Sequence, residues 1–492
     1  MNRRIIIYIL GRILMLEGAF MALPCIVSLC YREVSGWWFF IVMMGSILLG
    51  LLISFRRPKN TVFYIKEGCV ATALSWILLS VVGCLPFFLS GSIPDFTDAL
   101  FETISGFTTT GASVLSDVEA LPFCMLFWRS FTHWLGGMGV LVFLLAVIQM
   151  SGGSHMNLMK AESPGPSVGK LGPKVMYTAR ILYLIYIGLT VIHMGFLLAG
   201  GMPFFDTMTT AFGSAGTGGF GIKNDSIAGY SPYIQWVVTI FMVIFGVNFN
   251  FYFLLLFRKW KQAFRMEEVI SYLGVIIAAI ALVTWNIFST AANFGESLRH
   301  AAFQVSSIIT TTGYSTINFD LWPSTSRTIL VILMFVGACA GSTGGGIKVS
   351  RFVILMKTVG RQLKLFIHPK SVNKIKMDGK PVEDETVRGV GVYFITFIAI
   401  FVGSVICISF EGKDLLTNFT AVAATFNNIG PGLELVGPTQ NFGIFSVFSK
   451  YILMFDMLAG RLELFPLLIL FYPPAWKGIF RKRYKLPNRS NG

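Results

Sequence analysis

Four short segments rich in glycine and threonine recur along this sequence of 492 residues. They centre on Gly111, Gly219, Gly313 and Gly430, so consecutive copies stand 108, 94 and 117 residues apart. Each copy lies between two long apolar stretches. This pattern is typical of an internal repeat with one functional loop per copy. Residues upstream of the glycines also repeat at matching distances: Asp98 and Asp206, Phe101 and Phe303, Glu102 and Gln304.

The chemistry available to such segments is the coordination of a cation by the backbone. A cation that enters a pore sheds water, and consecutive carbonyl oxygens can replace that water without a full negative charge. Glycine permits the backbone angles that aim several carbonyls one way, because it has no Cβ. We therefore predict a cation selectivity filter formed by Thr109, Thr110, Gly111, Thr217, Gly218, Gly219, Thr311, Thr312, Gly313, Asn428, Ile429 and Gly430.

Small residues also let membrane helices pack closely, so one such segment alone would favour helix packing. Four copies at similar spacing favour a single pore with a pseudo-fourfold arrangement. The stretch before each glycine is too short to cross a membrane, which predicts a half-helix that turns back at the glycine. Its negative dipole end would then favour a cation.

The composition is that of a polytopic membrane protein. Hydrophobic residues make up 54% of the chain, charged residues only 13%, and the mean hydropathy is +0.70. A soluble chain of this length needs more charge to cover its surface. The net charge of +15 is explained first by membrane topology, because the basic residues lie mostly in short loops, and we predict no nucleic-acid partner. The seven cysteines show no metal-binding or disulfide spacing.

The apolar stretches predict an all-α fold of ten transmembrane helices: two N-terminal helices and four helix–pore loop–helix repeats. The predicted organisation is 1–60 for the N-terminal pair, then 61–160, 161–265, 266–380 and 381–492 for the repeats, the last with a basic tail. The expected spans are Ile5–Tyr31, Trp37–Phe55, Val70–Leu89, Phe123–Met150, Val175–Leu198, Tyr233–Phe257, Val269–Phe288, Arg327–Met356, Arg388–Phe410 and Phe448–Phe471.

Lysine and arginine concentrate in the loops that this order of spans places on one side of the membrane. The positive-inside rule assigns that side, with both termini, to the cytoplasm. The glycine-rich segments then enter the membrane from outside. The basic stretch 351–388 suits either a protein partner or anionic phospholipid.

The second helix of the third copy is interrupted by glycines between Gly337 and Lys348. So many glycines cannot hold a stable helix, and a break at membrane depth requires a cavity to line. The alternatives are a flexible loop that blocks the conduction path and a loose kink for close packing, and the first is favoured. The predicted gate residues are Gly341, Ser342, Thr343, Gly344, Gly345, Gly346, Lys348 and Arg461.

Arg461 lies within an apolar stretch, where a charge is costly unless it meets water or a partner. It either faces the pore below the filter as an electrostatic barrier or forms an ion pair with Asp456 or Glu463. Lys348 either lies near it or marks the inner end of the broken helix. For two charges of the first span, Arg12 and Glu17, we expect snorkelling or a partner on another helix.

Together these features resemble the TrkH/TrkG/KtrB superfamily of potassium transporters over nearly the whole chain. Phe107–Ser113, Thr310–Ser315 and Asn427–Gly432 are similar to the filter loops of that superfamily, and Gly337–Lys348 is similar to the intramembrane loop of TrkH proteins. The second loop, Gly216–Phe220, departs most, because glycines replace hydroxyl residues. The two additional N-terminal helices favour the TrkH branch.

The resemblance implies a function, a location and partners. Glycine in all four loops goes with potassium in this superfamily, so a gated potassium uptake pore in a bacterial inner membrane is expected. The resemblance also implies a homodimer in membrane lipid and a cytosolic nucleotide-binding regulatory subunit similar to TrkA. No cofactor is expected, since potassium itself is the transported ion bound in the filter.

One alternative is a potassium symporter coupled to protons or sodium. Coupling needs a further ion site, often with a membrane carboxylate, for which Asp456, Glu463 and Glu434 are the main candidates. A membrane enzyme is disfavoured, because the sequence carries no HExxH, GxSxG or paired-carboxylate motif.

Overall fold

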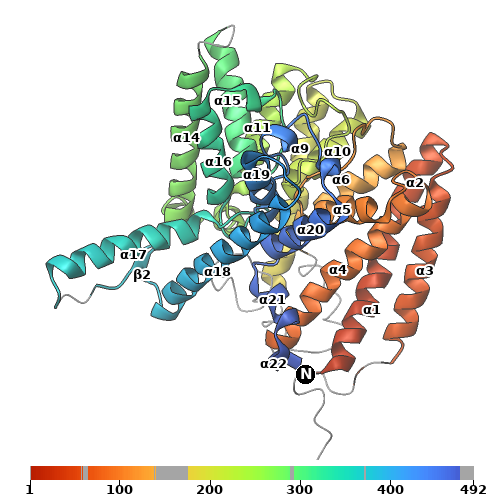
Figure 1. Cartoon of the computed structure of the whole chain (residues 1–492), viewed down its shortest axis with the longest axis horizontal. Helices are drawn as coiled ribbons and strands as arrows, with labels where there is room; N and C mark the ends of the chain where they lie inside the picture. Colours follow the sequence, from red (N-terminus) through yellow and green to blue (C-terminus); the bar gives the residue numbers. More distant parts are fainter. Residues whose placement is uncertain are drawn as a thin grey trace, which may run out of the picture.

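The computed structural model describes residues 2–56, 58, 65–137, 139, 175–288, 293–370 and 373–476. Nearly all regular structure in these ranges is helical (Figure 1). The exception is one antiparallel pair of short strands, β1 (Lys376–Met377) and β2 (Lys380–Pro381). The predicted all-α class is therefore confirmed for the described residues.

Three N-terminal helices form one side of the molecule, and α14 and α17 lie on the opposite side (Figure 1). They are α1 (Arg3–Phe20), α2 (Ala22–Tyr31) and α3 (Gly36–Ser54). Arg3–Tyr31 acts as one apolar span in spite of the break at Met21, and α3 packs back against α1. Both helices also contact α4, which attaches this pair to the rest of the chain.

The remaining helices follow the predicted fourfold order. The first copy comprises α4 (Ile65–Leu89), α5 (Phe96–Phe107) and α6 (Phe123–Gly137), and the second α9 (Val175–Ala199), α10 (Phe204–Gly216), α11 (Pro232–Gly246) and α12 (Phe249–Leu256). After α13 (Trp260–Ala263), the third comprises α14 (Glu267–Ile287), α15 (Phe294–Ile309), α16 (Ser324–Val336) and α17 (Val349–Ile367). The fourth comprises α18 (Asp384–Ser409), α19 (Leu415–Phe426), α20 (Val447–Arg461) and α21 (Phe465–Phe471), followed by α22 (Pro473–Trp476). Short 3-10 turns occur at Phe319–Leu321, Glu434–Val436 and Phe442–Ile444.

The four half-helices are α5, α10, α15 and α19, with 12, 13, 16 and 12 residues. At about 1.5 Å per residue, none can cross a hydrocarbon core of about 30 Å. Side chains cap three of them at the N-terminus: Asp95 accepts a hydrogen bond from the Asp98 amide, Asn293 from Glu296 and Asp414 from Thr417. The other ends of these helices are buried and lead directly into the glycine-rich segments.

Within the part of the chain that is described, six helices are long and apolar enough to cross a membrane. Together α11 and α12 are also apolar and long enough, but they meet at an angle of 89°, which is the geometry of a broken span or a re-entrant loop. The expectation of one straight helix over Tyr233–Phe257 is therefore wrong. Val247 is extended, and the Asn248 side chain caps α12 by accepting a hydrogen bond from the Asn250 amide at 2.9 Å.

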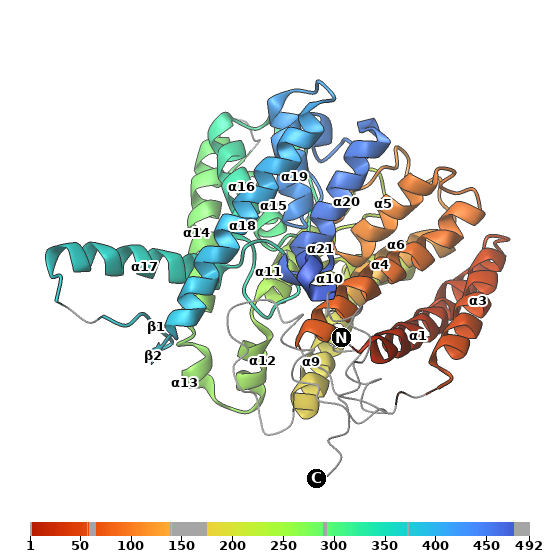
Figure 2. The same ribbon diagram turned by 60° about the horizontal axis from the view of Figure 1, so that its bottom comes forward.

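Two further spans are broken. The predicted interruption between Gly337 and Lys348 is confirmed, and beyond it α17 runs away from the rest of the molecule (Figure 2). The expected helix Phe448–Phe471 is wrong as a single element, because Glu463 and Leu464 have φ angles of 58° and 65°. The second half of the expected span Phe123–Met150 and the basic tail after residue 476 lie outside the described residues. The count of ten spans remains a prediction.

Candidate functional site

Each glycine-rich segment forms a turn with the same unusual backbone. The central glycine and the residue two positions before it both have positive φ angles. Residues with a Cβ adopt this left-handed region rarely, because the Cβ crowds the backbone, so its recurrence marks four equivalent turns. The angles are 55° and 78° at Thr109 and Gly111, 53° and 75° at Thr217 and Gly219, 59° and 84° at Thr311 and Gly313, and 57° and 101° at Asn428 and Gly430.

The four turns lie against one another in a closed ring. A Cβ added to each central glycine would collide with a backbone carbonyl oxygen of the next turn. These collisions pair Gly111 with Gly218, Gly219 with Thr312, and Gly313 with Ile429. The ring closes at Gly430, whose Cβ would lie 2.9 Å from the Thr110 oxygen. The structure therefore brings all four predicted segments together, and no side chain fits at the central position of any turn.

A buried ion pair braces the first two turns. Arg129 of α6 donates from Nε to Glu102 of α5 at 2.8 Å, and its NH1 group donates to the Gly221 carbonyl at 3.0 Å. Glu102 also accepts hydrogen bonds from the Ser113 hydroxyl at 3.0 Å and the Val114 amide at 3.1 Å. The two side chains thus hold the first turn against the second. The sequence marked Glu102 only as a repeated position and did not indicate Arg129.

We expect Arg129→Gln to destabilise the protein strongly, because it leaves the Glu102 carboxylate buried without its partner. Breaking a buried pair in this way costs about 3–5 kcal/mol. The control is Arg327→Gln, since the Arg327 pairs with Asp320 and Glu434 are partly exposed and 3.4 Å long, and such pairs contribute up to about 1 kcal/mol. Thermal unfolding of the purified proteins in detergent measures both changes. Equal unfolding temperatures for the two variants would contradict the bracing role.

His133 explains why the second turn departs from the others in sequence. Its Nδ1 lies 2.8 Å from the Gly106 carbonyl oxygen, and its Nε2 accepts a hydrogen bond from the Phe220 amide at 3.2 Å. Nδ1 therefore carries the hydrogen, and the neutral ring links the end of α5 to the second turn. A Cβ on Gly218 would overlap this ring. The glycine in place of a hydroxyl residue is thus a packing requirement.

Other side chains connect the remaining turns. Asn428 of the fourth turn donates to the Thr110 hydroxyl of the first at 2.9 Å and to the Met457 carbonyl at 2.9 Å. The Tyr314 hydroxyl, next to the third turn, donates to the Phe220 carbonyl of the second at 3.4 Å. The Asn428–Thr110 and Tyr314–Phe220 contacts each join residues from different copies.

The interrupted segment between α16 and α17 lies against the third and fourth turns. The Gly345 amide donates to the Thr311 hydroxyl at 2.6 Å, and the Gly346 amide donates to the Asn427 carbonyl at 3.1 Å. A Cβ on Gly344 would approach the Thr310 carbonyl oxygen to 2.9 Å. The predicted intramembrane loop is thus in direct contact with the ring.

Both predicted cationic residues bind this loop. Arg461 donates to the Thr343 carbonyl at 2.8 Å, and also to the carbonyls of Gly136 and Gly137 at the end of α6. Lys348, which is buried, donates to the Gly344 carbonyl. The two residues therefore hold neighbouring carbonyls of the same loop, so Lys348 lies at the loop and not merely at the inner helix end.

The two carboxylates considered as partners of Arg461 have other contacts. Glu463 forms an ion pair with Arg351 of α17, and Asp456 accepts a hydrogen bond from the Ser404 hydroxyl at 2.7 Å. The guanidinium of Arg461 also lies 5.9 Å from the ring centre of Trp76. Its hydrogen bonds to described residues therefore run to the loop and to α6.

Glu268 is a functional candidate that the sequence analysis missed. It is buried in the first turn of α14 and accepts hydrogen bonds from the Ala340 amide at 2.5 Å and from Asn248 at 3.2 Å. Backbone bonds join the same regions: Cys339 donates to the Gly246 carbonyl at 3.1 Å, and Phe249 to the Gly341 carbonyl at 2.9 Å. The loop is thus fastened at one end to the bend between α11 and α12 and at the other to the ring. In the sequence, the only indication of a role for Glu268 was its position as an acidic residue at the start of an apolar span.

Comparison with known proteins gives one consistent result. A family model described as "TrkH: Cation transport protein" matches residues 36–476. The Trk system potassium uptake protein TrkH of Salmonella typhimurium is 38% identical over 490 residues, which cover 97% of this chain and 100% of that protein. The TrkH protein of Escherichia coli K12 is 36% identical with the same coverage. The crystal structure of the potassium transporter TrkH from Vibrio parahaemolyticus aligns with a TM-score of 0.87 and 32% identity, over 97% of this chain and 100% of that one.

Proposed function

This chain belongs to the TrkH family of cation transport proteins, and we propose that it takes up potassium through a gated, potassium-selective pore. Membership of a transport family confirms the prediction that the chain is not an enzyme. The observation that carries the proposal is the closed ring of four glycine turns, where a carbonyl oxygen of each turn lies against the glycine of its neighbour. Potassium as the cargo is supported by the names of relatives that match over nearly their whole length.

In the proposed filter, potassium is the substrate and backbone oxygens of the twelve predicted residues replace its water. The four half-helices end at the ring, so their negative dipole ends lower the energy of a cation there. The central glycines keep neighbouring turns close enough for a single narrow passage. No cofactor takes part.

The loop between α16 and α17 is the proposed gate. It touches the third and fourth turns, and two positive side chains, Lys348 and Arg461, bind its carbonyls. A positive charge beside a cation path raises the energy of the passing ion, particularly where little water screens it. Opening would then require the loop to break its hydrogen bonds with Arg461 and with the Thr311 hydroxyl at the same time.

The protein is a multi-pass membrane protein. We place it in the bacterial inner membrane with both termini in the cytoplasm, because lysine and arginine concentrate on that side. Trk system transporters in general work with a regulatory subunit, and we propose a TrkA-like nucleotide-binding partner, a homodimer and surrounding lipid. The division into an N-terminal pair and four repeats is part of the same proposal.

Ion flux in liposomes tests the function directly. We expect purified protein to carry potassium and rubidium down their gradients, to exclude sodium, and to need no proton gradient. Empty liposomes are the control. Absence of potassium flux in either direction with folded protein would refute the proposal.

Coupled symport is the second candidate, and one observation favours it. Asp456 is fully buried between α18 and α20, and its Oδ2 atom has no hydrogen-bond partner among the described residues. A membrane carboxylate in this state is typical of a coupling site. The other two candidate carboxylates are paired, Glu463 with Arg351 and Glu434 with Arg327. Symport predicts that an imposed proton or sodium gradient alone drives potassium uphill in the liposomes.

A further inference from the structure

Glu17 is a second buried carboxyl group that the proposed pore does not use. It lies on α1 with 2% of its surface exposed, and neither carboxyl oxygen has a hydrogen-bond partner among the described residues. The expected partner on another helix is therefore not found in that part of the chain. Arg12, five residues earlier, donates to the Tyr8 hydroxyl of the same helix at 3.2 Å. Among the described residues no partner on another helix is found for Arg12, so the choice between snorkelling and a partner on another helix stays a prediction.

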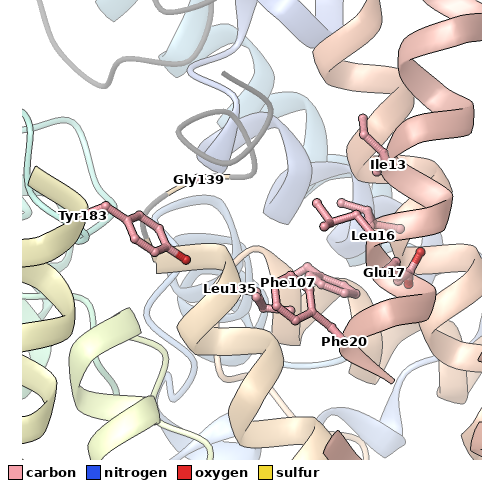
Figure 3. Close-up of a pocket in the computed structure, with 9 residues that line it drawn as sticks. Ile13, Leu16, Glu17, Phe20, Phe107, Leu135, Gly139 and Tyr183 are labelled. Atoms are coloured by element: carbon pink, nitrogen blue, oxygen red, sulfur yellow. The ribbon is translucent and has the colours of Figure 1, made fainter. Parts of the chain in front are cut away.

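Glu17 forms part of the wall of a partly open cavity of about 30 Å³ (Figure 3). Tyr183 of α9 lies across the cavity from the α1 residues, with Phe107 and Leu135 between them. The volume is enough for about two water molecules, at roughly 10–15 Å³ each in this measure. Apart from Glu17 and the Tyr183 hydroxyl, the described side chains that line the cavity are apolar, so these residues offer no set of oxygen ligands for a metal cation.

No cation neutralises Glu17 from the helices that surround it, within the described residues. The titratable groups that face it are Cys84 of α4 and Tyr183 of α9. The α3 helix, which packs along α1, carries no titratable side chain. Arg129 is paired with Glu102, and Lys450 with Asp98. An ionised carboxylate here would be buried without compensation, whereas a bound proton removes the charge.

The Glu17 cavity is lined by Phe107, which leads into the first turn of the ring. Phe107 is the last residue of α5, directly before Thr108–Gly111. A Cβ on Gly83 would lie 2.8 Å from the Phe107 ring and 3.1 Å from a Glu17 oxygen. Both groups therefore pack against Gly83, where a larger residue would crowd them. The Phe107 ring also packs edge-on against Trp128, which donates to the Gly83 carbonyl at 3.0 Å. Glu17 and Phe107 therefore share one packing environment around Gly83.

We propose that Glu17 is a proton-binding site that regulates the pore, because its charge state controls the packing of Phe107 behind the first glycine turn. The compact arrangement described above suits the neutral, protonated acid. Loss of the proton draws water into the cavity and displaces Phe107, which disturbs the turn. This regulation rests on the proposed potassium pore, but the binding of the proton does not.

Infrared spectroscopy tests the proton site without reference to transport. We expect the carbonyl stretching band of protonated carboxylic acids in the wild-type protein to contain a component that disappears as pH rises and is missing in Glu17→Gln. The control Glu385→Gln removes an exposed carboxyl group at the start of α18 and should leave the band unchanged. An identical band in wild type and Glu17→Gln would overturn the assignment.

Potassium flux measured between about pH 5 and about pH 9, the range in which buried acids titrate, tests the regulation. We expect wild-type flux to fall as pH rises, and Glu17→Gln to keep the low-pH flux throughout. Glu17→Asp should restore a pH dependence, which a purely structural role would not. Flux with the same pH profile in wild type and folded Glu17→Gln would refute the regulation. Absence of wild-type flux at every pH would instead refute the pore, and the infrared result would still decide the proton site.

Discussion

Replacing Gly313 with serine is expected to reduce potassium-over-sodium selectivity by roughly tenfold or more, since each 1.4 kcal/mol is a factor of ten. Gly313 has a φ of 84°, where a residue with a Cβ is strained by about 1–2 kcal/mol. The added Cβ would also collide with the Ile429 carbonyl oxygen and lie 2.9 Å from Pro431. The fourth turn must shift to relieve this contact, and a filter with displaced oxygens no longer matches one ion size.

The measurement is the ratio of potassium to sodium flux in liposomes. Gly403→Ser is the matched control, because a Cβ on this glycine of α18 meets no atom within 4 Å and it should leave the ratio unchanged. A folded Gly313→Ser protein with the wild-type ratio would remove the third turn from the filter.

Deleting Ala340–Gly346 is expected to raise potassium flux, because it removes the segment that Arg461 and Lys348 hold against the ring. The deletion also removes the Gly345 and Gly346 contacts to the third and fourth turns, so selectivity could change with it. Arg461→Gln separates the two effects, because it leaves every loop residue in place. A hydrogen bond from a charged group contributes about 1.5–3 kcal/mol, so the flux should rise about ten- to hundredfold.

Cys339 offers a second measurement of the same movement. It is fully buried in the loop between α16 and α17, and its amide donates a hydrogen bond to the Gly246 carbonyl. We expect a maleimide to label Cys339 slowly in wild type and faster in Arg461→Gln, with the labelled peptide identified by mass spectrometry. Cys30, which is exposed at the end of α2, should react equally in both proteins. Wild-type flux together with unchanged Cys339 labelling in Arg461→Gln would contradict the gate.

The local features of this protein were predictable because they depend on the backbone of a few neighbouring residues. Glycine at Gly111, Gly219, Gly313 and Gly430 predicted four turns, and each has a φ that glycine alone adopts without strain. The run of glycines after Gly337 predicted the break in the third copy in the same way. Apolar length predicted the membrane class, since a bilayer admits few alternatives to helices.

The straightness of the spans was predicted less well. Hydropathy does not report the 89° bend after Gly246 or the left-handed residues Glu463 and Leu464. Both breaks are set by capping and by contacts with other helices, which an apolar count does not record. For the same reason the sequence alone left the partner of Arg461 open between the pore and an ion pair.

The sequence by itself thus determined which backbone segments can turn at membrane depth, because that property is carried by glycine at each position. Only the tertiary structure decided how the turns are held together. Asn428 and Thr110 are 318 residues apart, and Arg461 and Gly137 are 324 apart, yet they are hydrogen-bonded. The roles of His133 and Glu268 follow from such distant contacts, and that of Glu17 from the lack of a hydrogen-bond partner among the described residues. Contacts between distant residues leave no periodic pattern in the sequence.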